Sequence, residues 1–183
     1  MTKARLQKDF KIVEPKSRAA WRTWLQKNHT QQESIWLVLA KKDSGLPSLS
    51  VEDAVEEALC FGWIDSVPNK VDDKRYKILL SPRKPKSNWS NVNKQRAARL
   101  IKAGLMTEPG MKMITLAKKT GTWNALNAID KLIIPPDLKD LFASNPKAAN
   151  YFEAFPSSVK KEYWNGFKMQ TLKPRAPSAL MKR

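Results

Sequence analysis

Apolar and polar positions follow two different patterns in the first half of the chain. Residues 35–40 form a continuous apolar run that is short and partly β-branched, which is typical of a buried strand. After Ser50, apolar residues recur at helical spacing, at Val51, Ala54, Val55, Ala58 and Leu59. Ser50 and Asp53 approximate a capping box, so a helix is expected to begin there, with Glu52, Glu56 and Glu57 facing water.

Shorter segments complete the expected elements. Ser17 is a candidate N-cap for a helix that carries Trp21, Trp24 and Leu25 on one face. Residues 64–67, 70–71 and 75–80 predict short strands joined by turns. From Ser90 onward the pattern is helical, with boundaries expected at Gly104, Gly121, Pro135 and Ser157.

These elements predict an α+β fold, with a small few-stranded sheet and helices in the N-terminal part and a helical C-terminal part. We assign residues 1–134 to an α+β core domain and residues 135–183 to a helical appendage with a basic, frayed tail. In the appendage, Val159, Tyr163 and Phe167 form a helical stripe. The residues expected to be buried are Val51, Val55, Ala58, Leu59, Ile35, Leu37 and Leu39.

The composition is that of a globular protein, but its charge is unusual. The 183 residues are 42% hydrophobic and 28% charged, and 34 Lys and Arg against 17 Asp and Glu give a net charge of +17. This charge favours anionic partners, including nucleic acid, an anionic membrane surface or a phosphorylated metabolite. A polar N-terminus and the lack of a long apolar run predict a cytoplasmic protein without a transmembrane segment.

The single cysteine and single histidine limit the chemistry. Cys60 cannot form an intramolecular disulfide, and Cys60 with His29 cannot supply an ordinary zinc site, so we expect no metal and no cofactor. Phosphate-loop, dinucleotide and nucleophile-elbow motifs are absent. A catalytic Cys60–His29 pair is disfavoured because Cys60 ends an apolar helix, where a thiol is expected to be buried and inert.

The densest basic segment predicts an anion site. Residues 70–102 contain eleven basic residues and only two acidic residues, Asp72 and Asp73. The basic residues are Lys70, Lys74, Arg75, Lys77, Arg83, Lys84, Lys86, Lys94, Arg96, Arg99 and Lys102. Residues 81–90 then lead directly into a helix N-terminus, where backbone N–H groups and the helix dipole favour an anion. The candidate ligand-binding residues in this segment are Arg83, Lys84, Lys86, Asn88, Trp89 and Ser90. A solvated basic loop is the competing interpretation.

A second distinctive segment, residues 60–65, supplies candidates for an opposite wall. Trp63 and Asp65 follow the turn that Gly62 allows. Asp65 is a candidate for pairing with Arg83, with structural pairing favoured over a catalytic role.

Residues 57–65 and 81–90, followed by Asn93 and Lys94, resemble the YdeI/OmpD-associated family of bacteria, also described as bacteriocin-protection proteins. The resemblance extends from about Phe10 to about Lys168, and the segment after Lys168 departs from the family's pattern. It implies a role in tolerating bacteriocins or cationic peptides, and it implies no reaction, cofactor or catalytic set.

Three functions therefore remain open. The first is a non-enzymatic stress protein that binds an anionic small molecule or surface at the predicted site. The second is a nucleic-acid-binding protein that uses the basic face of residues 70–102. The third is an enzyme that acts on a phosphorylated or carboxylated small molecule, with Asp65 as acid or base. The sequence leaves the ligand and the oligomeric state open.

Overall fold

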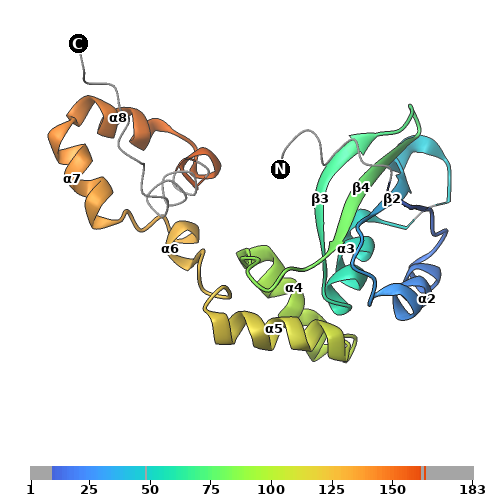
Figure 1. The fold of residues 1–183 in the computed structure, drawn as a ribbon. Coiled ribbons are helices and arrows are strands. Elements are labelled where there is room, and N and C mark those ends of the chain that lie inside the picture. The colour runs from blue at the N-terminus through green and yellow to red at the C-terminus, as the bar shows by residue number, and fades with distance from the viewer. Residues whose placement is uncertain (1–9, 48, 162, 164–183) are drawn as a thin grey trace, which may run out of the picture. The chain divides into compact units, whose positions relative to one another are not determined.

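The computed structural model describes residues 10–47, 49–161 and 163. The chain forms an α+β fold, as the sequence predicts, and its elements are shown in Figure 1. It separates into two compact units, Met1–Asn124 and Ala125–Arg183. The domain boundary expected from the sequence, after residue 134, lies further along the chain than this division after Asn124. The expected boundary stays a prediction.

The first unit is built on a four-stranded sheet with strand order β1-β2-β4-β3. The strands are β1 (Ile12–Val13), β2 (Ile35–Ala40), β3 (Trp63–Lys70) and β4 (Arg75–Pro82). β1 runs parallel to β2, whereas β4 pairs antiparallel with both β2 and β3. Residues 35–39 of the apolar run are buried because one face of β2 meets the core and because the strand lies inside the sheet.

The edge strand β3 is irregular. Its register with β4 shifts between the Asp65–Leu80 pair and the Pro68–Ile78 pair, as at a β-bulge. Proline has no N–H to donate to a neighbouring strand, and an edge strand tolerates it. The predicted strands 64–67 and 70–71 are therefore one interrupted strand, Trp63–Lys70.

Helices α2 (Arg18–Asn28) and α3 (Val51–Cys60) contribute to the core on one side of the sheet. Ser17 caps α2 by accepting the Ala20 N–H, and Ser50 caps α3 by accepting the Asp53 N–H at 3.0 Å. Six of the residues expected in the core are buried: Val55, Ala58, Leu59, Ile35, Leu37 and Leu39. A short 3₁₀ helix, η1 (Lys42–Ser44), follows β2.

Two expectations for α3 are wrong. Val51 is 47% exposed, because it is the first residue of the helix and lies before the part that packs on the sheet. Glu57 was expected to face water but is 2% exposed, because Arg18 and Arg22 of α2 bind its two carboxylate oxygens at 2.7 and 2.6 Å. Its charge is therefore neutralised inside the protein rather than by solvent.

Helices α4 (Asn91–Lys102) and α5 (Glu108–Thr120) complete the first unit. The start of α5 lies against the end of α3, where the Thr107 hydroxyl donates to the Cys60 carbonyl. Gly110 allows this approach, since a Cβ atom at that position would clash with the same carbonyl group.

The second unit is helical where it is described, with α6 (Asn127–Asp130), α7 (Pro136–Ser144) and α8 (Pro146–Ala154). Asn145 caps α8, and the ring centroids of Phe142 and Phe152 lie 5.0 Å apart. Residues 157–161 are helical, as expected after Ser157. Phe167 and the tail from Lys168 lie outside the described residues.

Candidate functional site

The predicted anion site lies where β4 ends and the chain turns toward α4. Arg83 is the first residue after β4, and its backbone N–H donates to the Gly62 carbonyl at 2.9 Å. This bond fixes the start of the loop beside the start of β3. Seven residues later, Ser90 caps α4 by accepting the Asn93 N–H at 3.3 Å.

The Arg83 side chain is buried rather than directed into solvent. The residue is only 4% exposed, and its guanidinium carbon lies 3.9 Å from the centroid of the Trp89 ring. Nη1 donates to the Asn88 carbonyl at 3.1 Å. Nε and Nη2 are buried, and neither has a hydrogen-bond partner among the described residues. A cation in this position retains donor groups that nothing in the described protein satisfies.

Burial also changes the acidity of Arg83. It lowers the pKa of the guanidinium from its usual value to about 10, while the negative charge of Asp65 raises it. Arg83 therefore keeps its proton at neutral pH. The influence of Asp65 on Arg83 is that of its charge.

The first turn of α4 adds further free donors. Among the described residues, no hydrogen bond takes up the backbone N–H groups of Asn91 and Val92, and both residues are exposed. The positive end of the helix dipole lies at these groups. Arg83 contacts Asn88 and Trp89, which lead directly into this turn.

The other face of this site was missed from the sequence. The Trp89 ring lies 4.9 Å from the Trp123 ring, and Lys118 Nζ lies 5.5 Å from the Trp123 centroid. The Trp89 backbone N–H also donates to the Thr122 carbonyl at 3.3 Å. The two indole rings are tilted by 44° to each other, and each has a cation over it, Arg83 at Trp89 and Lys118 at Trp123. Nothing near Arg83 in the sequence points to Trp123.

The remaining predicted residues occupy different surroundings. Lys84 and Lys86 are exposed, with a turn closed by the Ser87 N–H on the Lys84 carbonyl at 2.9 Å. Trp63 is 1% exposed, and its indole N–H donates to the His29 carbonyl at 3.0 Å, so its ring belongs to the core. Asp65 is half-buried on β3. Ligand contacts for Trp63 and Asp65 stay predictions.

The wider basic face is partly neutralised by the protein itself. Lys70 pairs with Asp73, Arg75 pairs with Asp72, and Arg99 pairs with Glu52 and Glu56. These pairs reduce the charge that the face of residues 70–102 presents to a nucleic-acid backbone. Arg83 differs from them because it is buried.

The surroundings of Cys60 do not favour nucleophilic chemistry. Cys60 is fully buried, and burial raises the pKa of its thiol to about 11. His29 Nδ1 lies 3.1 Å from the Leu25 carbonyl in its own helix. Among the residues that the structure describes, no three His, Cys, Asp or Glu side chains gather so as to hold a metal ion.

Comparison with known families adds an identification. A family model described as a domain of unknown function, DUF8412, matches residues 13–113, which is more than half of the chain. The chain belongs to the DUF8412 family. The DUF8412 match includes the sheet except Ile12, and most of the Arg83 site, from Arg83 through α4, whereas Trp123 lies beyond it. No curated protein and no solved structure matches the chain.

A second family model, described as "Bacteriocin-protection, YdeI or OmpD-Associated", matches residues 131–171. The resemblance to that family is thus confirmed in part, and over a region of the second unit. Residues 57–65 and 81–90, on which the resemblance was based, fall within the DUF8412 match instead. In the part of the chain that the structure describes, no helix has both the length and the apolar character needed to cross a bilayer.

Proposed function

We propose that the chain is a bacteriocin-tolerance-type protein whose DUF8412 part binds an anionic group, a phosphate or a carboxylate, at Arg83. The observation that carries the proposal is a protonated guanidinium that is 4% exposed and has two N–H-bearing atoms without partners. The Asn88 carbonyl and the Trp89 ring offset the burial cost of this cation without satisfying Nε and Nη2, and a bound anion would satisfy these remaining donors. The bacteriocin-protection match supplies the biological context.

The arrangement suits an anion better than another ligand. The guanidinium fork can bind two oxygens at once, and the free N–H groups of Asn91 and Val92 offer further donors. Lys84 and Lys86 would raise the local concentration of the anion. Because Nε and Nη2 are covered, the surroundings of Arg83 must open when an anion binds.

The test is an anion titration of the full chain that follows thermal unfolding and heat of binding. Inorganic phosphate, sulfate and citrate are the probes. A ligand at a hundred times its Kd stabilises the native state by about 2.7 kcal/mol. We expect this stabilisation in the wild type and in Lys84→Met, and its loss in Arg83→Met, which removes the same charge.

Two outcomes would overturn the proposal. In one, none of the three anions stabilises the wild type. In the other, Arg83→Met and Lys84→Met weaken binding equally, which indicates a diffuse basic surface. If oligonucleotides bind in their place, with a steep loss of affinity in salt, the nucleic-acid function replaces the small-anion function.

A further inference from the structure

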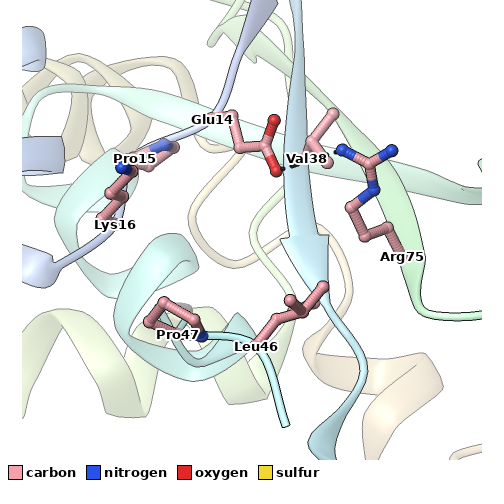
Figure 2. A pocket seen from close by; sticks show the side chains of 8 residues that line it. Glu14, Pro15, Lys16, Val38, Leu46, Pro47 and Arg75 are labelled. Atoms are coloured by element: carbon pink, nitrogen blue, oxygen red, sulfur yellow. Dashed lines mark hydrogen bonds and ion pairs between the residues drawn. The ribbon is translucent and has the colours of Figure 1, made fainter. Parts of the chain in front are cut away.

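A separate hollow lies on the face of the sheet that points away from α2 and α3. It has a volume of about 290 Å³, near the lower end for small-molecule sites. Its apolar wall is formed by Pro15, Val38, Ala40, Leu46 and Pro47. Figure 2 shows Val38 between Glu14 and Arg75, with Leu46 and Pro47 on the opposite side of the hollow.

Strand alternation explains why apolar and charged groups meet there. Ile35, Leu37 and Leu39 belong to the core, so Val38 and Ala40 project from the opposite face of β2. Ala40 pairs with Arg75 in the antiparallel register, which places the Arg75 side chain on the same face. Glu14 follows the short parallel strand β1 and reaches the hollow from the other side.

Arg75 is held firmly on one side only. Asp72 Oδ2 accepts from Arg75 Nε at 2.9 Å and lies 2.8 Å from Nη2, while Oδ1 accepts the backbone N–H groups of Lys74 and Arg75. These contacts fix the guanidinium and leave Nη1 directed at Glu14. The Nη1–Oε1 distance is 3.5 Å, the outer limit of a hydrogen bond.

The carboxylate of Glu14 and the guanidinium of Arg75 therefore face each other across an apolar floor without a tight bond (Figure 2). Both side chains remain open to solvent, at 53% and 39% exposure. A second hollow of about 500 Å³ adjoins the first and shares Leu46 and Arg75 with it. The two hollows give space beside this ion pair, and a ligand that contacts both charged groups has to separate them.

We propose that this hollow binds a free apolar α-amino acid in its zwitterionic form. The ligand carboxylate binds Arg75 Nη1, and its ammonium group binds Glu14. The apolar side chain covers Val38, Leu46 and Pro47. Such a ligand replaces one long internal ion pair by two close charge-assisted contacts. A ligand with only one charge makes only one of these two contacts. Lys16 at the rim adds attraction for the carboxylate.

The test compares L-leucine with two fragments of it, each titrated calorimetrically into the full chain. The fragment 4-methylpentanoate lacks the ammonium group, and 3-methylbutylamine lacks the carboxylate. We expect saturable binding of L-leucine and at least tenfold weaker binding of each fragment. Glu14→Gln should weaken L-leucine at least tenfold and leave 4-methylpentanoate at least as tight as before, because a repulsive carboxylate has been removed.

Glu52→Gln is the matched control, since Glu52 is an exposed glutamate on α3 and not part of the hollow. It should leave L-leucine binding unchanged, and so should Arg83→Met, because the two sites share no residue. L-leucine that fails to bind, or binds Glu14→Gln as tightly as wild type, overturns the proposal. Equal affinity for 4-methylpentanoate also overturns it, since the hollow would then bind simple acids.

Discussion

Replacing Arg83 by methionine tests whether this residue serves stability or binding. Burial lowers the pKa of Arg83 to about 10, which means that the native state disfavours the charged form by roughly 3 kcal/mol. Against this stand the bond to the Asn88 carbonyl, roughly 1.5–3 kcal/mol, and the Trp89 stack, about 2 kcal/mol. A methionine side chain recovers part of the Trp89 contribution by a contact between its sulfur and the ring.

These contributions nearly cancel. We therefore expect the unfolding free energy of Arg83→Met, without added anion, to stay within about 1.5 kcal/mol of the wild type. Urea unfolding in a buffer free of phosphate and sulfate measures this, and Lys84→Met controls for the change in net charge. A loss of about 3–5 kcal/mol, the usual cost of breaking a satisfied buried ion pair, would refute the reasoning and make Arg83 a structural residue.

The pH dependence gives the same experiment a second readout. The pKa of Arg83 is lower in the folded chain than in the unfolded chain. At pH values between these two pKa values, the unfolded chain therefore holds more protons than the folded chain. The cost of the buried charge is fully present below about pH 10 and falls as the pH rises from there. The stability difference between wild type and Arg83→Met should thus move in favour of the wild type above about pH 10. An unchanged difference would show that Arg83 is not desolvated.

Three further predictions concern the core. Gly110→Ala should destabilise the chain by roughly 1–3 kcal/mol in urea unfolding, because its Cβ would overlap the Cys60 carbonyl; wild-type stability would contradict the packing of α5 on α3. Glu57→Gln should cost about 3 kcal/mol by leaving two arginines without their buried partner, whereas Glu52→Gln should change stability by less than about 0.5 kcal/mol. Cys60 should resist thiol reagents at pH 8 until the protein is unfolded, and rapid labelling of the native chain would argue against its burial.

Local signals in the sequence predicted much of the fold. The caps at Ser17, Ser50 and Ser90 were readable because a cap depends on residues three positions apart. Strand β1 was not readable, because two residues carry no periodicity and its partner lies elsewhere in the chain. Glu57 was misjudged because a glutamate on a helix faces water unless a distant arginine reaches it.

The sequence predicted which segment forms the candidate site, but it did not predict the surroundings of the side chains in that segment. The order of basic loop, tryptophan and capping serine pointed to Arg83, Trp89 and Ser90. The burial of Arg83 could not be read from that order, because it depends on packing around the Trp89 ring and on Trp123, which follows α5. The hollow beside Glu14 was missed, since only the parallel pairing of β1 brings that carboxylate to the Arg75 guanidinium.

The two edges of the sheet bear on how the protein behaves at high concentration. One edge is β1, which has two residues, and the other is β3, where Pro68 and a register shift interrupt the row of backbone groups. An aggregating chain needs a long, regular row of free N–H and C=O groups as a template. As the described residues form it, this sheet offers such a template on neither side, and like chains of charge +17 also repel each other.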